Sequence, residues 1–222
     1  MPDDKLMSIA LVDSCPAMCL GIRQMLEEIG GYRVALCAGS GEAYLEACAA
    51  QEVPQLALVD LQMPGMGGFV TIAAMRERGL RTWAVGTTLE TTEEVVMRAH
   101  TVGARGVLTK RFSPAMLAGA LGDVRASGYH YPDPGHRKLA LAARDTKSRA
   151  ADGALRLARL TDTELKVLKR LRAGKSYDAI AADMKLSPYT VADHLKKIRE
   201  KTGCHSRAEL MVFAHDTGLL DQ

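Results

Sequence analysis

YDAIAADMKLSPYTVADHLKKIREK, residues 177–201, is the most informative stretch of this chain, because two helices and the turn between them can be placed in it nearly residue by residue. The pattern predicts a short helix over residues 177–184, a Leu-Ser-Pro turn, and a second helix over residues 189–201. Ser187 is a favourable N-cap, and Pro188 suits the first helical position. Apolar residues spaced four and three apart give the second helix a face to bury, while its charged face stays in water. We therefore expect duplex DNA as a partner, with the charged face of the second helix entering a major groove.

A longer run around this stretch resembles the LuxR-type helix-turn-helix. The family run is L-T-x-x-E, then G-x-S-x-x-x-I-A, then S-x-x-T-V-x-x-H, then S-R-x-E-L. The resemblance implies a DNA-binding domain over residues 159–222. The matching residues are Leu160, Thr161, Glu164, Gly174, Ser176, Ile180, Ala181, Ser187, Thr190, Val191, His194, Ser206, Arg207, Glu209 and Leu210.

The resemblance also implies that the start and the exposed face of the second helix contact DNA. One position departs from the family, because Ala192 stands where lysine is usual and Asp193 follows it. Losing a cation and placing an acid near phosphates weakens sequence-independent binding, unless Asp193 accepts a hydrogen bond from a cytosine amino group. An alternative stays open, namely that Lys196 and Lys197 are only solvated surface charges. The expected DNA-contacting residues are Tyr189, Thr190, Ala192, Asp193, Lys196 and Lys197.

Charge divides unevenly along the 222 residues. Residues 1–130 carry 11 basic and 14 acidic side chains, residues 131–159 carry 7 and 3, and residues 160–210 carry 11 and 7. With 47% hydrophobic residues, the length is enough for two modest domains with cores of their own. An acidic front half and a basic back half favour regulation in front and nucleic acid binding behind.

Cysteine usage and hydropathy narrow the protein class. Five scattered cysteines without paired C-x-x-C spacing argue against a disulfide framework or a zinc site. The N-terminus has no basic leader before an apolar segment, and no apolar run approaches the length that spans a bilayer. We expect a cytoplasmic protein without a membrane partner.

The front half alternates short apolar runs with helical patterns, as in a parallel sheet covered on both faces. Chemistry in such sheets gathers beyond the carboxyl ends of the strands. Polar residues fall there in four of the five units, namely Asp13, Asp60, Thr88 and Lys110. The predicted strands are residues 8–12, 33–38, 55–59, 82–87 and 106–109, and the predicted helices are residues 16–29, 42–50, 69–78, 92–101 and 114–126.

Together with the run LVDLQMPGMGG at residues 58–68, these polar residues resemble the receiver domain of two-component response regulators. With the C-terminal motif, nearly the full chain resembles the NarL/FixJ subfamily. The resemblance implies a five-stranded, doubly wound, flavodoxin-like α/β receiver domain over residues 1–128, a linker over residues 129–158, and the all-α helix-turn-helix domain.

The resemblance assigns a role to each pocket residue. Asp60 would accept a phosphoryl group from a sensor histidine kinase, Lys110 would neutralise the phosphoryl oxygens, and Thr88 would hydrogen-bond one of them. The spacing of 22 positions before Lys110 favours Thr88 over its neighbour. The carboxylates of Asp13 and Asp60 and the backbone carbonyl of Gln62 would hold Mg²⁺, which prefers hard oxygen ligands.

Two departures affect this pocket. The family's first strand usually ends in two acids, whereas here Ser14 follows the single Asp13 and offers at most a neutral hydroxyl to Mg²⁺. In the fifth strand, the aromatic residue that the family carries shortly before the lysine, here Lys110, is replaced by Val107. Two hypotheses stay open: a DNA-binding transcriptional regulator controlled by phosphorylation of Asp60, or an atypical regulator whose degenerate receiver acts through protein or ligand binding, with reduced DNA binding.

The remaining expectations concern assembly and catalysis. A closing helix over residues 207–217, with Leu210, Phe213 and Ala214 on one side, resembles the family's dimer-forming element, so a homodimer on two-fold DNA half-sites is expected. Beyond the receiver pocket no nucleophile-base pair or cofactor loop is recognisable, and we do not expect an enzyme.

Overall fold

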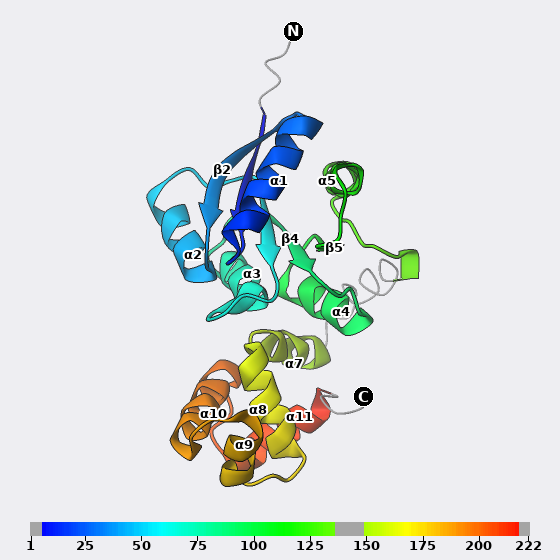
Figure 1. Cartoon of the computed structure of the whole chain (residues 1–222). Helices are drawn as coiled ribbons and strands as arrows, with labels where there is room; N and C mark the ends of the chain where they lie inside the picture. The colour runs from blue at the N-terminus through cyan, green and yellow to red at the C-terminus, as the bar shows by residue number, and fades with distance from the viewer. Residues whose placement is uncertain (1–5, 136–148, 218–222) are drawn as a thin grey trace. The chain divides into compact units, whose positions relative to one another are not determined.

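The computed structural model describes residues 6–135 and 149–217 of the chain (Figure 1). The chain forms two compact units, residues 1–145 and 146–222. No helix among the described residues combines the length and the apolar character that a membrane crossing requires.

The first unit alternates strands and helices, as predicted. Its strands are β1 (Met7–Val12), β2 (Tyr32–Ala38), β3 (Leu56–Asp60), β4 (Trp83–Thr88) and β5 (Gly106–Thr109). Its helices are α1 (Pro16–Ile29), α2 (Gly41–Ala50), α3 (Gly67–Glu77), α4 (Glu93–Val102) and α5 (Pro114–Ser127).

All five strands pair in parallel in the order β2-β1-β3-β4-β5, which is the flavodoxin-like arrangement. Helices α1 and α5 pack together on one face of the sheet, and α2, α3 and α4 cover the other (Figure 1). Every residue of β3 is buried, because a strand between two helical layers has no wet face. The predicted fold class is confirmed for this unit.

Helix α3 begins at Gly67, two residues earlier than predicted. Glycine is a poor helix former, so the sequence pattern placed the start at Phe69. The structure gives Gly68 a different role, since a Cβ there would lie 2.1 Å from the backbone oxygen of Asp60. The helix can approach the end of β3 this closely only because Gly68 has no side chain.

The start of the free edge of β5 is covered by the chain that follows α5. His130 pairs with Gly106 in a parallel bridge, through hydrogen bonds from Val107 N to His130 O (3.2 Å) and from His130 N to Arg105 O (2.9 Å). A covered edge offers no template for pairing with another strand. Part of the range predicted as a linker therefore extends the sheet of the first unit.

The second unit is all-helical, as predicted. Its helices are α7 (Arg149–Ala158), α8 (Asp162–Arg172), α9 (Tyr177–Met184), α10 (Pro188–Thr202) and α11 (Arg207–Asp216). Helix α7, which lies in the range predicted as a linker, packs against α10 and α11. The Arg156 guanidinium also donates a hydrogen bond to the backbone oxygen of Thr202 at 3.1 Å.

Apolar faces of the five helices meet in one core. Its fully buried side chains include Leu168 of α8, Ile180 of α9, and Val191 and Ile198 of α10. Helix α9 ends at Met184 and is followed by its C-cap, Lys185, which adopts the left-handed conformation (φ 55°). Ser187 then caps α10 by accepting a hydrogen bond from the backbone N–H of Thr190 at 3.0 Å. The cap and the helix pair confirm the predicted helix-turn-helix.

Candidate functional site

The carboxyl edge of the sheet brings three of the four predicted pocket residues into contact. Asp13 follows β1, Asp60 ends β3 and Lys110 follows β5. The Lys110 ammonium nitrogen lies 2.8 Å from Oδ2 of Asp13 and 2.9 Å from Oδ2 of Asp60. Parallel strands end at the same edge, which is why residues as far apart in sequence as Asp13 and Lys110 meet.

Each aspartate is held by a backbone N–H two residues further on. Oδ1 of Asp13 accepts from Cys15 N at 2.8 Å, and Oδ1 of Asp60 accepts from Gln62 N at 2.9 Å. These local turns fix both carboxyl groups, so that each directs its other oxygen to Lys110. The arrangement therefore presents two carboxylates to one cation.

Burial strengthens the electrostatics of this cluster. Asp13 and Asp60 are each 5% exposed, and the Lys110 side chain is 12% exposed. Desolvation lowers the pKa of Lys110, but hydrogen bonds and attraction from Asp13 and Asp60 outweigh it, so the pKa is raised above its ordinary value of 10.5. Lys110 is fully charged at neutral pH.

Thr88 lies at the same edge but does not join the ion cluster through its side chain. Its hydroxyl donates to the backbone oxygen of Glu90 at 3.1 Å and accepts from Glu90 N at 3.4 Å. The backbone oxygen of Thr88 accepts from Lys110 N at 2.6 Å, which joins the ends of β4 and β5. The hydroxyl must leave Glu90 before it can bond a group attached to Asp60.

The oxygen donors at this edge suit Mg²⁺ chemically but are few. Asp13, Asp60 and the backbone carbonyl of Gln62 supply hard oxygens. Ser14 is exposed and adds only a hydroxyl. Among the described residues, no cluster of three or more histidine, cysteine, aspartate or glutamate side chains could hold a metal ion. A bound Mg²⁺ would therefore keep several waters in its octahedral shell. Val107, the other departure, is fully buried in β5.

Helix α10 presents the surface predicted to contact DNA. Tyr189 is 84% exposed at its start, and Ala192 and Lys196 are also exposed. Val191, Leu195 and Ile198 are buried on the opposite side. The predicted division into a buried and a wet face is confirmed.

Three of the expected DNA-contacting side chains already bond to neighbours in or next to α10. Lys197 lies 2.8 Å from Oδ2 of Asp193, one turn earlier. The hydrogen bond from Lys197 lowers the pKa of Asp193 despite some desolvation, so this acid stays charged at neutral pH. The Thr190 hydroxyl lies 2.8 Å from the hydroxyl of Ser187. Of the two lysines, Lys196 is the one whose charge no described acid neutralises.

Sequence reasoning missed an ion pair that joins α10 to α8. Glu164 is only 2% exposed, and its carboxylate lies 2.7 Å from the Lys201 ammonium. The same carboxylate accepts from Thr161 N at 2.7 Å, while the Thr161 hydroxyl accepts from Glu164 N at 3.2 Å. This is a capping box, and the run T-x-x-E at the start of a helix is a signal that could have identified it.

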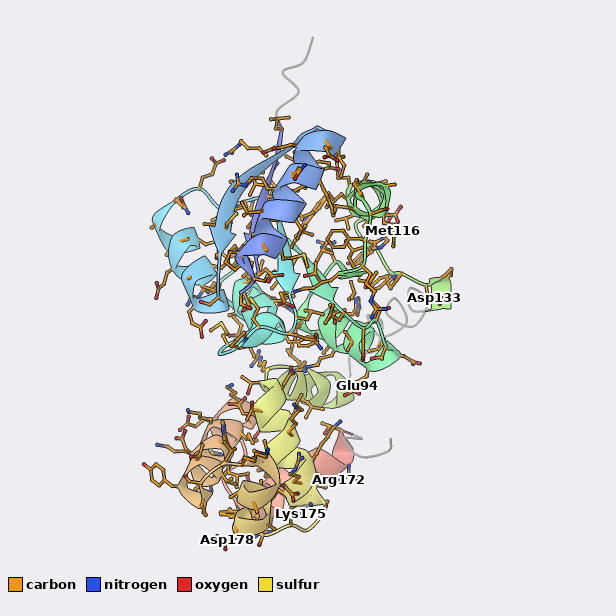
Figure 2. The ribbon with its side chains drawn as sticks, in the orientation of Figure 1. Glu94, Met116, Asp133, Arg172, Lys175 and Asp178 are labelled. Carbon is orange, nitrogen blue, oxygen red and sulfur yellow. The ribbon has the colours of Figure 1, made fainter. Side chains whose placement is uncertain are left out.

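Other charged side chains of this unit lie on its outer surface, as Figure 2 shows for Lys175 and Asp178. Lys175 forms an ion pair with Asp183, which the Arg170 guanidinium also approaches at 3.5 Å. These exposed pairs contribute little to stability.

The expected dimer surface on α11 needs a correction. Leu210 is 1% exposed and Ala214 is fully buried, and both belong to the core of their own unit, where α11 packs against α8. Phe213 is partly buried against the same core. Leu210 and Ala214 cannot also cover a partner while this core is intact. Among the described residues of α11, the large apolar side chain that is exposed is Val212, at 59%.

Comparison with known families covers both units. Residues 9–121 match the response regulator receiver domain, and residues 158–214 match the bacterial regulatory proteins of the luxR family. The first match contains all four predicted pocket residues, and the second contains the whole helix-turn-helix.

Relatives with both domains align along nearly the full chain. The transcriptional activator protein ExaE of Pseudomonas putida is 32% identical over 96% of this chain and 98% of its own. A probable transcriptional regulatory protein NarL of Mycobacterium tuberculosis H37Rv is 31% identical over 99% of each.

Solved structures share the fold. RcsB of Salmonella enterica serovar Typhimurium, solved bound to promoter rprA in the presence of the phosphomimetic BeF3-, has a TM-score of 0.53 at 20% identity, covering 93% of this chain and 97% of that one. On the two family matches and these relatives, the chain belongs to the NarL/FixJ-type response regulators, transcriptional regulators that combine a receiver domain with a LuxR-type helix-turn-helix DNA-binding domain.

Proposed function

We propose that phosphorylation of Asp60 by a sensor histidine kinase controls this regulator. The observation that carries the proposal is the contact of one ammonium group, that of Lys110, with both Asp13 and Asp60 at the carboxyl edge of the sheet. A carboxylate oxygen of Asp60 would attack the phosphorus atom of a phosphohistidine. The P–N bond breaks as the acyl phosphate forms, and the departing histidine nitrogen takes up a proton from solvent.

The chain's own groups match what this transfer needs. Phosphoryl transfer depends mainly on positioning and on neutralising charge. Gln62 N orients the Asp60 carboxylate, and Lys110, which stays charged at neutral pH, would move to the new phosphoryl oxygens. The Thr88 hydroxyl would exchange Glu90 for a phosphoryl oxygen. That exchange offers a structural change to couple phosphorylation with the surface around α4.

Receiver domains as a family bind Mg²⁺ for phosphorylation. In this chain Asp13, Asp60 and the Gln62 carbonyl would hold the ion, which neutralises phosphoryl charge when bound. We propose that the site is weaker than usual, because Ser14 contributes no charge and Mg²⁺ affinity depends on ligand charge. Lys110 also pairs with both carboxylates and therefore competes with Mg²⁺ for them.

The DNA contacts proposed for α10 follow from exposure and pairing. Tyr189 and Lys196 project freely, so we assign them the main contacts to bases or phosphates. Lys197 contributes less to DNA affinity than an unpaired lysine would, as long as it is paired with Asp193. Thr190 and Ala192 complete the surface at the start of the helix. A homodimer that spans two half-sites suits such a domain, through a surface other than Leu210 and Ala214.

The experiment is intact-mass measurement after incubation of the full chain with acetyl phosphate and Mg²⁺. We expect the added mass of one phosphoryl group, lost in Asp60→Asn. As a matched variant, Ser14→Asp restores the family's second acid and should lower the Mg²⁺ needed for half-maximal labelling by about fivefold or more, since a charge close to the ion is worth at least about 1 kcal/mol.

The outcomes separate the two hypotheses for the receiver. If neither the natural chain nor Ser14→Asp gains mass at millimolar Mg²⁺, the phosphorylation proposal is wrong, and a regulator that works without phosphate replaces it. Equal labelling of Asp60→Asn would move the acceptor to another residue and would also overturn the assignment of Asp60.

A further inference from the structure

A cavity of about 580 Å³ opens at the edge of the receiver sheet opposite Asp60. Its walls come from the C-terminal end of α3, the start of β4 and the connection between α4 and β5. Trp83 begins β4 and lines the cavity, whereas Thr88 ends the same strand beside the ion cluster. The length of β4 therefore separates the cavity from the pocket already described.

Three arginines line this cavity: Arg76, Arg81 and Arg105. Arg76 and Arg81 are exposed, and Arg105 is half-buried. In the described ranges, residues 6–135 and 149–217, none of the three forms an ion pair with a carboxylate. Three guanidinium groups around one concavity repel one another unless an anion joins them. Guanidinium groups also bind phosphate and carboxylate through paired hydrogen bonds.

Capping of α3 does not account for these arginines. Cations near a helix C-terminus can bond its last carbonyls. Here those carbonyls accept from the chain's own N–H groups: Arg78 N to Ala74 O at 3.0 Å, Gly79 N to Arg76 O at 3.1 Å, and Leu80 N to Met75 O at 3.0 Å. The guanidinium of Arg78 points elsewhere and donates to Leu45 O at 3.2 Å. The guanidinium groups of Arg76 and Arg81 are thus available to a ligand, while that of Arg105 approaches the rings of Trp83 and, at 5.1 Å, Tyr129.

Apart from Thr82, the other lining residues are apolar or glycine, and they include the chain's single tryptophan. Ile72 and Met75 are buried beneath the cavity, and Leu80 and Trp83 are half-buried at its side. The guanidinium carbon of Arg105 lies 5.6 Å from the centre of the Trp83 ring. An apolar wall beside an arginine that already approaches an aromatic ring suits a flat apolar group.

We propose that this cavity binds an organic anion that carries two or more negative charges on a flat apolar body. Arg76, Arg81 and Arg105 would contact its charged groups, and Trp83 with Leu80 would pack against its body. Nucleoside polyphosphates and aromatic polycarboxylates both have this chemistry. The site is independent of Asp60, so its occupancy would give the receiver a second input.

The test uses the fluorescence of Trp83 in the full chain, because no other tryptophan contributes. ATP and benzene-1,3,5-tricarboxylate are titrated as representatives of the two classes of anion. Adenosine supplies a flat body without the negative charges, and pyrophosphate supplies negative charges without a flat body. Equilibrium dialysis with the same four compounds measures binding if the fluorescence does not change. The variants are Arg76→Ala/Arg81→Ala and, as a control, Arg33→Ala, an exposed arginine on β2 at the far edge of the sheet.

We expect saturable binding of ATP, the tricarboxylate or both, and at least tenfold weaker binding of adenosine and pyrophosphate. The double variant should weaken binding about tenfold or more, since hydrogen bonds to charged groups are lost. Arg33→Ala and Asp60→Asn should bind as the natural chain does. The proposal fails if neither anion binds at millimolar concentration, if pyrophosphate binds as tightly as the larger anions, or if the double variant binds normally.

Discussion

Lys110 is the residue on which the ion cluster depends. Its ammonium group is the cation that pairs with both buried carboxylates, those of Asp13 and Asp60. In Lys110→Ala the two acids would face each other without a cation, and we expect the free energy of unfolding of the receiver to fall by about 2 kcal/mol, below the loss for a fully buried pair because the site is partly open. Mg²⁺ should restore part of this stability in the variant. Urea unfolding followed by Trp83 fluorescence, with and without Mg²⁺, measures both effects.

Lys110→Arg is the matched control, because it keeps the charge and should remain near the stability of the natural chain. The pH dependence has a definite sign. The Lys110 pKa is raised in the folded state, so its ion pairs stabilise fully below its ordinary value of 10.5 and lose their effect as the pH rises through the folded value. The deficit of Lys110→Ala should be constant near neutral pH and shrink above pH 10.5. A deficit that disappears at neutral pH would contradict this account.

At the scale of residues, the sequence predicted which side chains gather but not how they bond. The carboxyl ends of parallel strands share an edge, so Asp13, Asp60 and Lys110 could be placed together before any coordinates. Rotamers depend on neighbours in space, and Thr88 accordingly bonds Glu90 instead of the cluster. The same limit explains Leu210: its spacing on α11 marks an apolar face, and periodicity alone does not distinguish a core from a dimer surface.

At the scale of elements, α10 carries a prediction about charge. Asp193 pairs with Lys197 and lies on the face assigned to DNA. In Asp193→Asn the lysine is released and an acid is removed, so non-specific duplex binding should tighten several-fold. The slope of log affinity against log salt concentration should steepen by about one, because one further phosphate contact forms. Fluorescence anisotropy with a labelled duplex at several salt concentrations measures both quantities.

Glu46→Gln, on α2 of the receiver, also removes one negative charge, but at a position far from α10 in the sequence. It is the control for the effect of net charge alone. It should leave the salt slope unchanged. An equal gain in both variants would show that overall charge, and not α10, governs binding. Tighter binding with an unchanged slope in Asp193→Asn would contradict the release of Lys197.

Helix ends were predictable where a side chain caps them and less so where backbone packing decides. Ser113 and Ser187 stand before Pro-initiated helices and accept backbone N–H groups, as predicted for Ser187. The start of α3 was missed because Gly68 is selected by its close approach to Asp60, a tertiary requirement. Helix α7 lies in a basic stretch predicted as a linker, and its packing against α10 and α11 was not visible in the local pattern.

At the scale of the whole molecule, the chain length, the hydrophobic content and the uneven charge predicted two domains, and the structure gives each unit its own core. Leu117 is fully buried in the receiver core, and Leu168 in the core of the second unit. We expect Leu168→Ala to destabilise the second unit by about 3 kcal/mol through the lost burial and the cavity left behind, without changing receiver unfolding. Leu117→Ala should do the reverse.

Two signals separate the units, because Trp83 lies in the receiver and reports only on it, whereas far-ultraviolet circular dichroism reports on helices of both. In urea, Leu168→Ala should shift to lower urea the part of the circular dichroism transition that comes from the second unit, and leave the Trp83 transition where it is. Leu117→Ala should move the Trp83 transition by a similar free energy. If Leu168→Ala also shifts the Trp83 transition, the two cores unfold as one cooperative body, and the helix-turn-helix is energetically coupled to the receiver even without phosphate.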